Sequence, residues 1–210
     1  LEAVIQSIDV ETIYDVPLKM LEEGLNRVVL EKLQLKAKQE PDLTEWKQFL
    51  EKFKNPKEKI KIGLVGKYVE LQDSYKSILE SLFHAGAKNE TQVDIISIHS
   101  EEVDHASEAE LLSQVDGVLV APGFGERGIE GKITAVQYAR EKKIPFLGIC
   151  LGMQMAVIEY ARNCAGIAKA NSTEMDPDCE APVIDLMESQ KTILSKGGTM
   201  RLGAWDCQLE

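Results

Sequence analysis

The sequence predicts an α/β protein, with a doubly wound, mostly parallel β-sheet, helices on both faces and a short helical segment in front. Three observations lead to this prediction. Four short apolar runs, rich in β-branched residues and leucine, follow one another from residue 60 onward. Stretches with helical spacing separate these runs. Before residue 60 the chain shows helical periodicity but no convincing strand.

The opening part of the chain is expected to hold two helices. Pro17 suits a first helical turn, and apolar residues then recur at helical spacing. Asp42 or Thr44 can cap a second helix, "LTEWKQFLEKF", which stops before an Asn-Pro pair. The charged stretch "KNPKEK" at 54–59 is typical of a linker, so we place a domain boundary there.

The rest of the chain alternates between strands and helices. Strands are predicted at 60–66, 93–99, 116–121 and 145–149. Helices are predicted near 73–88, 107–114 and 131–143, and directly after residue 150. This order implies βαβ units, with ligands at the carboxyl ends of parallel strands. We expect "ANSTEMDPDCEAP" to be an ordered loop and "GGTMRLGAWDCQLE" to be strand material.

Composition excludes several classes of protein. The formal net charge is −11 and no basic stripe is present, which argues against a nucleic-acid partner. No run of 18 apolar residues and no signal peptide is found, so no membrane segment is expected. The chain lacks an initiator Met, as an excised piece of a longer protein would. Its four cysteines share no metal-ligand spacing, so we expect no metal and a reducing cytoplasm.

The segment "GICLG" has the spacing of a nucleophile elbow around Cys150. Gly148 and Gly152 are needed there because larger side chains would collide in so sharp a turn. A thiol at the N-terminus of the following helix is activated by the helix dipole, and the Leu151 N–H is placed to donate to an oxyanion. The alternative is a buried structural cysteine with glycines that allow close helix–strand packing.

A second glycine cluster, "APGFGERGIEGK" at 121–132, contains the G-x-G-x-x-G pattern of dinucleotide sites. It follows the third predicted strand rather than the first, and Glu126 and Glu130 would repel a pyrophosphate. We therefore favour a loop that turns backbone N–H groups toward Cys150, with a flexible surface loop as the alternative.

Other candidate residues are less specific. Gln154 lies one helical turn after Cys150 and either binds the polar head of a substrate or faces solvent. Glu174 is placed in a loop and is a candidate for a substrate α-amino group, although acidic loop residues are usually solvated. His84, His99 and His105 are bases by residue type only, and we expect structural or solvated roles for them.

These segments together resemble a known family. "GICLGMQ" is similar to the nucleophile motif of class I glutamine amidotransferases. Within that class, the flanking segments resemble the CTP synthase family, in the same order and over nearly the whole chain. They are "SIDVETIYDVPL", "IGLVGKYVELQDSYKSI", "PGFGERGIEGK", "GICLGMQMAVIEYARN", "ANSTEMDPD" and "GGTMRLGAWDC".

The resemblance implies a division of the chain. Residues 1–35 would be the C-terminal tail of a synthetase domain, 36–58 the interdomain linker, and 59–210 the amidotransferase domain. The implied reaction is hydrolysis of L-glutamine through a Cys thioester, which supplies ammonia for the ATP-dependent amination of UTP to CTP, a ligase reaction. The chain itself would need no cofactor. ATP and Mg²⁺, the activator GTP and a homotetramer would belong to the whole enzyme.

The resemblance also assigns residues. Cys150 matches the nucleophile, and Gly123 and Leu151 match the oxyanion-hole amides. The positions that match glutamine-binding residues are Gly123, Phe124, Leu151, Gly152, Met153, Gln154 and Glu174. The stretch that matches a region implicated in the GTP effect contains Arg127, Gly128, Glu130 and Gly131.

Two departures from the family pattern change the expectations. Pro122 replaces a glycine of the commoner loop and removes one N–H donor, so we expect an altered loop that keeps its oxyanion hole. The catalytic His and Glu of the family lie downstream of residue 210, so this stretch alone is expected to be nearly inactive. The alternatives are another hydrolase with a Cys elbow and a non-catalytic regulatory or assembly module.

Overall fold

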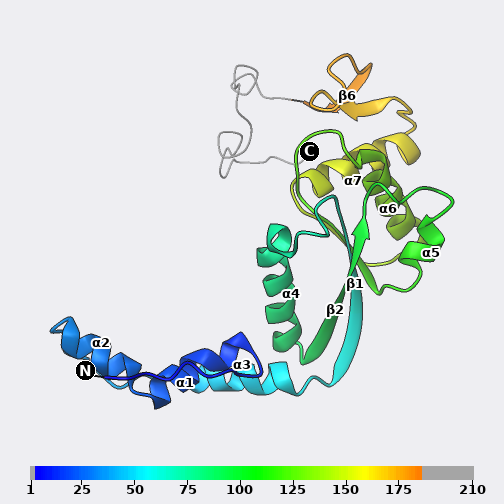
Figure 1. Ribbon diagram of the computed structural model, residues 1–210. Helices are drawn as coiled ribbons and strands as arrows, with labels where there is room; N and C mark the ends of the chain where they lie inside the picture. The colour runs from blue at the N-terminus through cyan, green and yellow to red at the C-terminus, as the bar shows by residue number, and fades with distance from the viewer. Residues whose placement is uncertain (1–2, 186–210) are drawn as a thin grey trace. The chain divides into compact units, whose positions relative to one another are not determined.

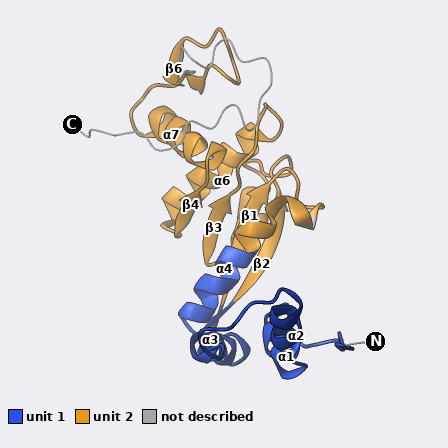
Figure 2. Ribbon diagram, turned by 90° about the vertical axis from the view of Figure 1, so that its left-hand side faces the viewer, with its two compact units in different colours: residues 1–59, 80–92 blue, residues 60–79, 93–210 orange. Residues whose placement is uncertain are grey.

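The computed structural model describes residues 3–185, which form two compact units (Figures 1 and 2). Within the described residues, unit 1 consists of residues 3–59 and 80–92, and unit 2 of residues 60–79 and 93–185. The strand predicted in "GGTMRLGAWDCQLE" and the cysteine within it lie outside the described residues. No helix among the described residues has the length and apolar character needed to cross a membrane.

Unit 1 is helical, as its periodicity predicts. Its elements are η1 (Ile13–Asp15), α1 (Val16–Glu22), α2 (Leu25–Lys32), α3 (Thr44–Lys54) and most of α4 (Lys76–Lys88). The single helix predicted after Pro17 is wrong, because Gly24 adopts a left-handed conformation with φ 77° and separates α1 from α2. The change of direction at Gly24 is invisible to a periodicity argument, since the apolar spacing continues across it.

An aromatic cluster around Tyr14 forms the interior of unit 1. The Tyr14 ring lies 5.1–6.0 Å, centroid to centroid, from the rings of Trp46, Phe49, Phe53 and His84. The Tyr14 hydroxyl donates to Glu80, and the Tyr14 carbonyl accepts from the Trp46 indole at 2.8 Å. Burial and the Glu80 carboxylate together raise the pKa of Tyr14 to about 12. His84 therefore has a packing environment, as expected.

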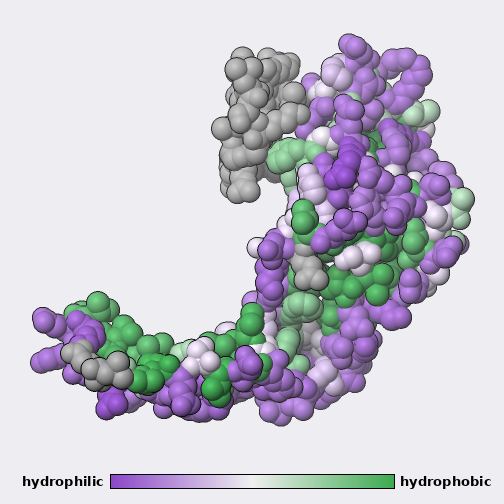
Figure 3. All heavy atoms as spheres, in the orientation of Figure 1, coloured by the Kyte–Doolittle hydropathy of each residue, from purple (hydrophilic) through white to green (hydrophobic). Residues whose placement is uncertain are grey.

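Unit 1 also exposes hydrophobic side chains, which gather along its helices in Figure 3. Ile13 and Leu33 keep 63% and 61% of their surface exposed. The other large exposed hydrophobic residues of this segment are Val4, Ile8, Val29 and Leu35. So many apolar residues on one small unit are typical of a surface that another protein body covers.

Unit 2 is built on a four-stranded sheet with the order β2-β1-β3-β4. The strands are β1 (Glu58–Gly66), β2 (Thr91–His99), β3 (Gly117–Val120) and β4 (Phe146–Gly148). β1 pairs with β3 and β3 pairs with β4, both in parallel. The predicted α/β class with a mostly parallel sheet is confirmed, and each predicted strand end is correct to within two residues.

Helices pack on this sheet and close the core. They are α5 (Glu108–Leu112), α6 (Ile129–Lys142) and α7 (Leu151–Asn163), and the short η2 (Gln72–Tyr75) precedes α4. The core joins Val120 of β3 to Ile133 of α6 and Met155 of α7. Arg140 of α6 forms a bidentate ion pair with Glu159 of α7. The Glu159 carboxylate is almost fully buried.

The segment predicted as a loop at 170–182 contains two short strands instead. β5 (Ala170–Ser172) and β6 (Ala181–Ile184) pair in parallel as a separate two-stranded sheet. Each strand is only three or four residues long, and Pro182 lies within the second, so neither shows a readable apolar alternation. Pairing between the strands, not local pattern, defines this sheet.

The ends of the four main strands bring the motif residues to one edge. Lys67 follows β1, Ser100 follows β2, Ala121 follows β3 and Cys150 lies two residues after β4. Because β1, β3 and β4 are parallel, their carboxyl ends share one edge of the sheet, where α/β proteins bind ligands.

Candidate active site at the carboxyl edge of the sheet

Cys150 occupies a strained turn between β4 and α7. Its φ and ψ are 54° and −106°, a conformation that costs a side-chain-bearing residue free energy of roughly 1–3 kcal/mol. The turn is held by the Ile149 N–H, which donates to the Val120 carbonyl at 3.1 Å, and by the Gly152 N–H, which donates to the Ile149 carbonyl at 2.9 Å. The chain thus has the backbone of a nucleophile elbow.

The two flanking glycines are required by contact with backbone. A Cβ on Gly148 would lie 2.6 Å from the carbonyl carbon and oxygen of Gly152, and one on Gly152 would lie 2.2 Å from the Val120 carbonyl oxygen. Backbone atoms of a strand and a helix cannot move aside as a flexible side chain can. The spacing in "GICLG" is therefore a steric requirement of the turn.

The elbow places the Cys150 thiol in a polar setting. Cys150 is the N-cap of α7 and is exposed. The Leu151 N–H is the first of α7, so it has no acceptor within the helix, and the helix dipole adds partial positive charge there. The Leu151 side chain is only 1% exposed, which anchors this first turn in the core.

The Gly loop, defined as residues 121–125, lies against this elbow. A Cβ on Gly123 would lie 3.8 Å from Leu151 Cδ2, so the loop and the first turn of α7 are neighbours. The Ala121 N–H donates to the Val65 carbonyl at 2.9 Å, which continues the sheet pairing into the loop. Among the described residues the Gly123 N–H has no protein acceptor, so it remains available to a ligand.

Two buried lysines, which the sequence analysis missed, hold the Gly loop from within. Lys132 Nζ donates to the Ala121 carbonyl at 3.2 Å, and Lys67 Nζ donates to the Phe124 carbonyl. Lys132 is 0% exposed and Lys67 6%. Burial lowers the pKa of Lys132 to about 8; the Lys67 ammonium acts in the same direction, and the charge of Cys150 opposes it. The sequence offered one signal for Lys67: it directly follows the strand predicted at 60–66, and so lies at the edge of the sheet where ligands are expected.

Gln154 has an unsatisfied polar atom. Its backbone N–H donates to the Cys150 carbonyl at 3.1 Å in the first turn of α7. Its side-chain Oε1 is buried and has no hydrogen-bond partner within the described part of the chain. A buried acceptor without a donor costs about 1–3 kcal/mol, so this atom is suited to a donor group on a ligand.

Of the other residues predicted to bind glutamine, Phe124 and Met153 are exposed and Glu174 lies away from the elbow in the sequence of elements. Phe124 and Met153 are 41% and 51% exposed. Glu174 lies in the turn between β5 and β6, where its N–H donates to Ser172 Oγ at 3.2 Å. The geometry thus brings Gly123 and Leu151 together at the elbow, whereas Glu174 belongs to the separate small sheet.

The other two histidines lie in acidic surroundings. His99 Nδ1 lies 3.6 Å from a Glu101 oxygen, and His105 Nδ1 lies 3.5 Å from a Glu108 oxygen. The His105 side chain is 73% exposed, as a solvated residue would be, whereas the His99 side chain is only 21% exposed and is partly packed.

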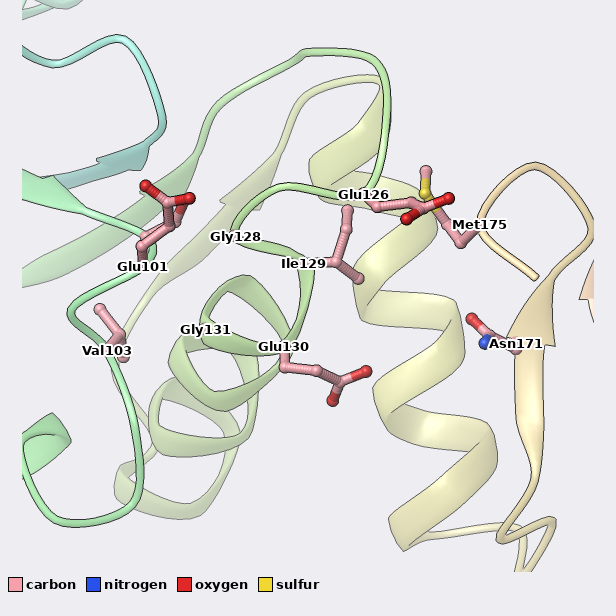
Figure 4. Close-up of a pocket in the computed structure, with 10 residues that line it drawn as sticks. Glu101, Val103, Glu126, Gly128, Ile129, Glu130, Gly131, Asn171 and Met175 are labelled. Carbon is pink, nitrogen blue, oxygen red and sulfur yellow. The ribbon is translucent and has the colours of Figure 1, made fainter.

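A cavity of about 460 Å³ adjoins the stretch assigned to the GTP effect (Figure 4). Gly128, Glu130 and Gly131 line it, together with Glu101 and Glu126. Glu130 pairs with Arg162 at 3.0 Å and Glu101 lies 3.6 Å from Arg127, so arginines offset part of the negative charge on the cavity wall. Figure 4 shows the Glu126 side chain beside Met175, which lies between β5 and β6, and the Glu130 side chain extending from α6 toward α7. Neither Cys150 nor the Gly123 loop position belongs to this cavity.

The effector stretch also has structural roles. Gly128 adopts φ 72° at the start of α6, and a Cβ on Gly131 would lie 1.7 Å from the Ser100 carbonyl oxygen. Arg127 does not line the cavity: one guanidinium nitrogen donates to the Lys67 carbonyl at 3.2 Å, and another lies 3.6 Å from Glu101. A role of these residues toward GTP stays a prediction.

The sequence is also similar to a known protein family and to curated proteins of that family. The family model described as "Glutamine amidotransferase class-I" matches residues 70–209. The chain is 69% identical over 208 residues to a CTP synthase of Flavobacterium psychrophilum, covering 99% of this chain and 39% of that protein. It is 56% identical over 210 residues to a CTP synthase of Methanocaldococcus jannaschii, covering 97% of this chain and 39% of the relative.

A solved structure is similar as well. It is a Trypanosoma brucei CTPS glutaminase domain with bound acivicin, with a TM-score of 0.58 and 39% sequence identity, covering 62% of this chain and 51% of that one. The chain spans about 39% of the length of the curated relatives that it matches.

Proposed function

Because the chain belongs to the class I glutamine amidotransferases, we propose that Cys150 attacks the side-chain amide of L-glutamine and releases ammonia. The observation that carries this proposal is the strained conformation of Cys150 at the N-terminus of α7, with the Gly loop beside it. A strained residue kept by steric necessity at a ligand-binding edge is typical of a catalytic position.

The reaction has two balanced steps. The Cys150 sulfur bonds to the amide carbon of glutamine, the C–N bond breaks, and the thiol proton leaves with the nitrogen as ammonia. The γ-glutamyl thioester then reacts with water, which yields glutamate and restores the thiol. The helix dipole of α7 favours the thiolate that begins this sequence.

The amide oxygen becomes negatively charged during each step. The Leu151 N–H, free at the start of α7, and the Gly123 N–H, which has no acceptor among the described residues, are the donors that we assign to it. One such donor is worth about 10²–10³ in rate.

We assign recognition of the glutamine to Gln154 and Glu174. The buried Gln154 Oε1 lacks a donor among the described residues and would accept one from the substrate. The Glu174 carboxylate would attract the α-amino group, provided that the small sheet carries it to the elbow. Phe124, Gly152 and Met153 would contribute surface and backbone around the substrate.

We further propose that the ammonia serves amination of UTP to CTP in a longer polypeptide. High identity to CTP synthases over 99% of this chain supports this. Residues 1–35 would be the tail of a synthetase domain and 36–58 a linker, which fits the exposed apolar residues of unit 1. We assign ATP, Mg²⁺ and the tetramer to that longer protein, as the resemblance to the CTP synthase family implies.

A polypeptide of residues 1–210 alone is expected to bind glutamine but to turn it over slowly. No histidine follows Cys150 in this sequence, so proton transfer would rely on the thiol and water. Binding is therefore the sharper test of the site than turnover.

Saturation-transfer NMR with the Cys150→Ala variant tests recognition. L-glutamine should receive saturation and D-glutamine should not. In a titration, Gln154→Leu should raise the Kd for L-glutamine about ten-fold, which corresponds to about 1.4 kcal/mol. Tyr160→Phe, a change at a 60% exposed residue near the other end of the same helix, serves as the matched control. Equal signals from both enantiomers, or no response to Gln154→Leu, would refute the assigned pocket.

A further inference from the structure

We propose that Lys132 is a positioning residue for the Gly loop: its buried ammonium fixes the Ala121 carbonyl, so that the loop presents the Gly123 N–H toward Cys150. The proposal deepens the proposed function, because the loop supplies one of the two oxyanion donors assigned above. Its structural part concerns the loop alone and does not depend on the identity of the substrate.

The first observation is that Lys132 is buried without a carboxylate. It is 0% exposed and is among the largest fully buried side chains. Its one hydrogen bond within the described residues is to the Ala121 carbonyl, and no ion pair of Lys132 is found there. Burying a cation that is not paired with a carboxylate is costly, so a protein retains one where its hydrogen bond is needed.

The second observation is the set of anchors along the Gly loop. The Ala121 N–H is held by the Val65 carbonyl and the Ala121 carbonyl by Lys132. The Phe124 carbonyl is held by Lys67. The Ala121 carbonyl lies in the peptide plane that joins residues 121 and 122, and the Phe124 carbonyl in the plane that joins residues 124 and 125. The two lysines therefore hold the peptide planes at either end of the short stretch that contains Gly123.

The third observation is the packing around Gly123. A Cβ placed there would lie 3.8 Å from Lys132 Nζ and 3.3 Å from Lys67 Cε, and 3.8 Å from Leu151 Cδ2. The two lysines therefore form one side of the position, and the start of α7 forms another. A movement of either lysine changes the space in which Gly123 lies.

Pro122 leaves the loop with one backbone hydrogen-bond donor fewer. Proline has no N–H, so the backbone cannot contribute a hydrogen bond at that position. Lys132 supplies an anchor directly before it, on the Ala121 carbonyl. A methionine of similar length would fill the space but would leave this carbonyl without its donor.

Hydrogen exchange in the Lys132→Met variant tests the proposal. The Gly123, Phe124 and Gly125 amides should exchange about ten-fold faster than in the wild type, while those of α7 should not change. Thr134→Val, a nearly isosteric change of another buried polar residue on α6, should leave the loop amides unaffected. If Lys132→Met does not fold, Lys132→Gln tests the proposal with the opposite expectation. It is neutral and keeps an N–H donor, so the loop amides should exchange within about two-fold of the wild-type rate, and an acceleration of about ten-fold would overturn the role of the donor.

The second readout separates loop position from thiol access. Acivicin, a glutamine-like electrophile, should label Cys150 at least about ten-fold more slowly in Lys132→Met, whereas iodoacetamide should react within about two-fold of the wild-type rate. Unchanged loop exchange, or equal acceleration throughout unit 2, would overturn the positioning role. Failure of acivicin to label the wild-type protein would instead count against the proposed function, and the exchange result would still decide the role of Lys132.

Discussion

Replacing Lys132 by Met should remove a specific pH dependence from the stability of the protein. In the folded protein, burial and the Lys67 charge lower the pKa of Lys132 from 10.5 to about 8. In the unfolded chain the group has its ordinary value. Between these two pH values the unfolded state binds more protons, so the free energy of unfolding of the wild type rises with pH across this window.

The size of the effect follows from the shift. A difference of one pKa unit corresponds to about 1.4 kcal/mol, so the shift of Lys132 is worth about 3 kcal/mol in total. Lys132→Met lacks this contribution at every pH. The stability of the wild type relative to the variant should therefore increase by about 3 kcal/mol as the pH rises from about 7 to about 10.5.

Urea unfolding followed by circular dichroism, at a series of pH values, measures this difference. Urea is uncharged and leaves the electrostatic interactions unscreened. Other groups that titrate at high pH, such as Tyr14 with its raised pKa of about 12, are present in both proteins and cancel. A stability difference that stays constant from pH 7 to 10.5 would refute the reasoning, since Lys132 would then titrate alike in both states.

Three further substitutions test the packing described above, each by urea unfolding. Gly152→Ala should destabilise the protein by about 3 kcal/mol, because the new Cβ would collide with the Val120 carbonyl. Gly166→Ala should cost only about 1 kcal/mol, because Gly166 has a φ of 74° but open space around it. Equal effects of the two substitutions would contradict the steric account. Tyr14→Phe should lower the free energy of unfolding by about 1.5–3 kcal/mol below pH 10, through loss of the hydrogen bond to Glu80. The pKa of Tyr14 is about 12 in the folded protein and 10.0 in the unfolded chain, so this difference in stability should fade as the pH rises from 10 through 12. Arg140→Met should lower the free energy of unfolding by about 3 kcal/mol, because it leaves the buried Glu159 carboxylate without its ion-pair partner. Adding Glu159→Met should restore much of this loss. No recovery in the double variant would show that the two residues are not coupled.

The main sheet was predictable because each of its strands contains a short apolar stretch. The signal is strongest in β3, whose four residues are all buried and lack polar side chains. The elbow was predictable for a related reason, since the steric demands at Gly148 and Gly152 leave a visible spacing in the sequence. In both cases a local physical constraint restricts which residue types are allowed.

Features that depend on contacts between distant segments were not predictable. The break at Gly24 leaves the apolar spacing intact, and the β5–β6 pairing depends on strands too short to show a pattern. Lys67 and Lys132 acquire their roles only when the end of β1 and the start of α6 approach the Gly loop. A lysine in sequence is ordinarily assigned to the surface, so its burial has to be seen in the structure.

Mass-spectrometric mapping of acivicin labelling across the four cysteines tests the central claim most directly. We expect label on Cys150 alone, with protection by L-glutamine but not by D-glutamine, although Cys164 is also exposed. This result would show that the elbow and its pocket recognise the glutamine side chain. Label spread over Cys150 and Cys164 alike, unaffected by L-glutamine, would contradict the account, because accessibility alone would then determine reactivity.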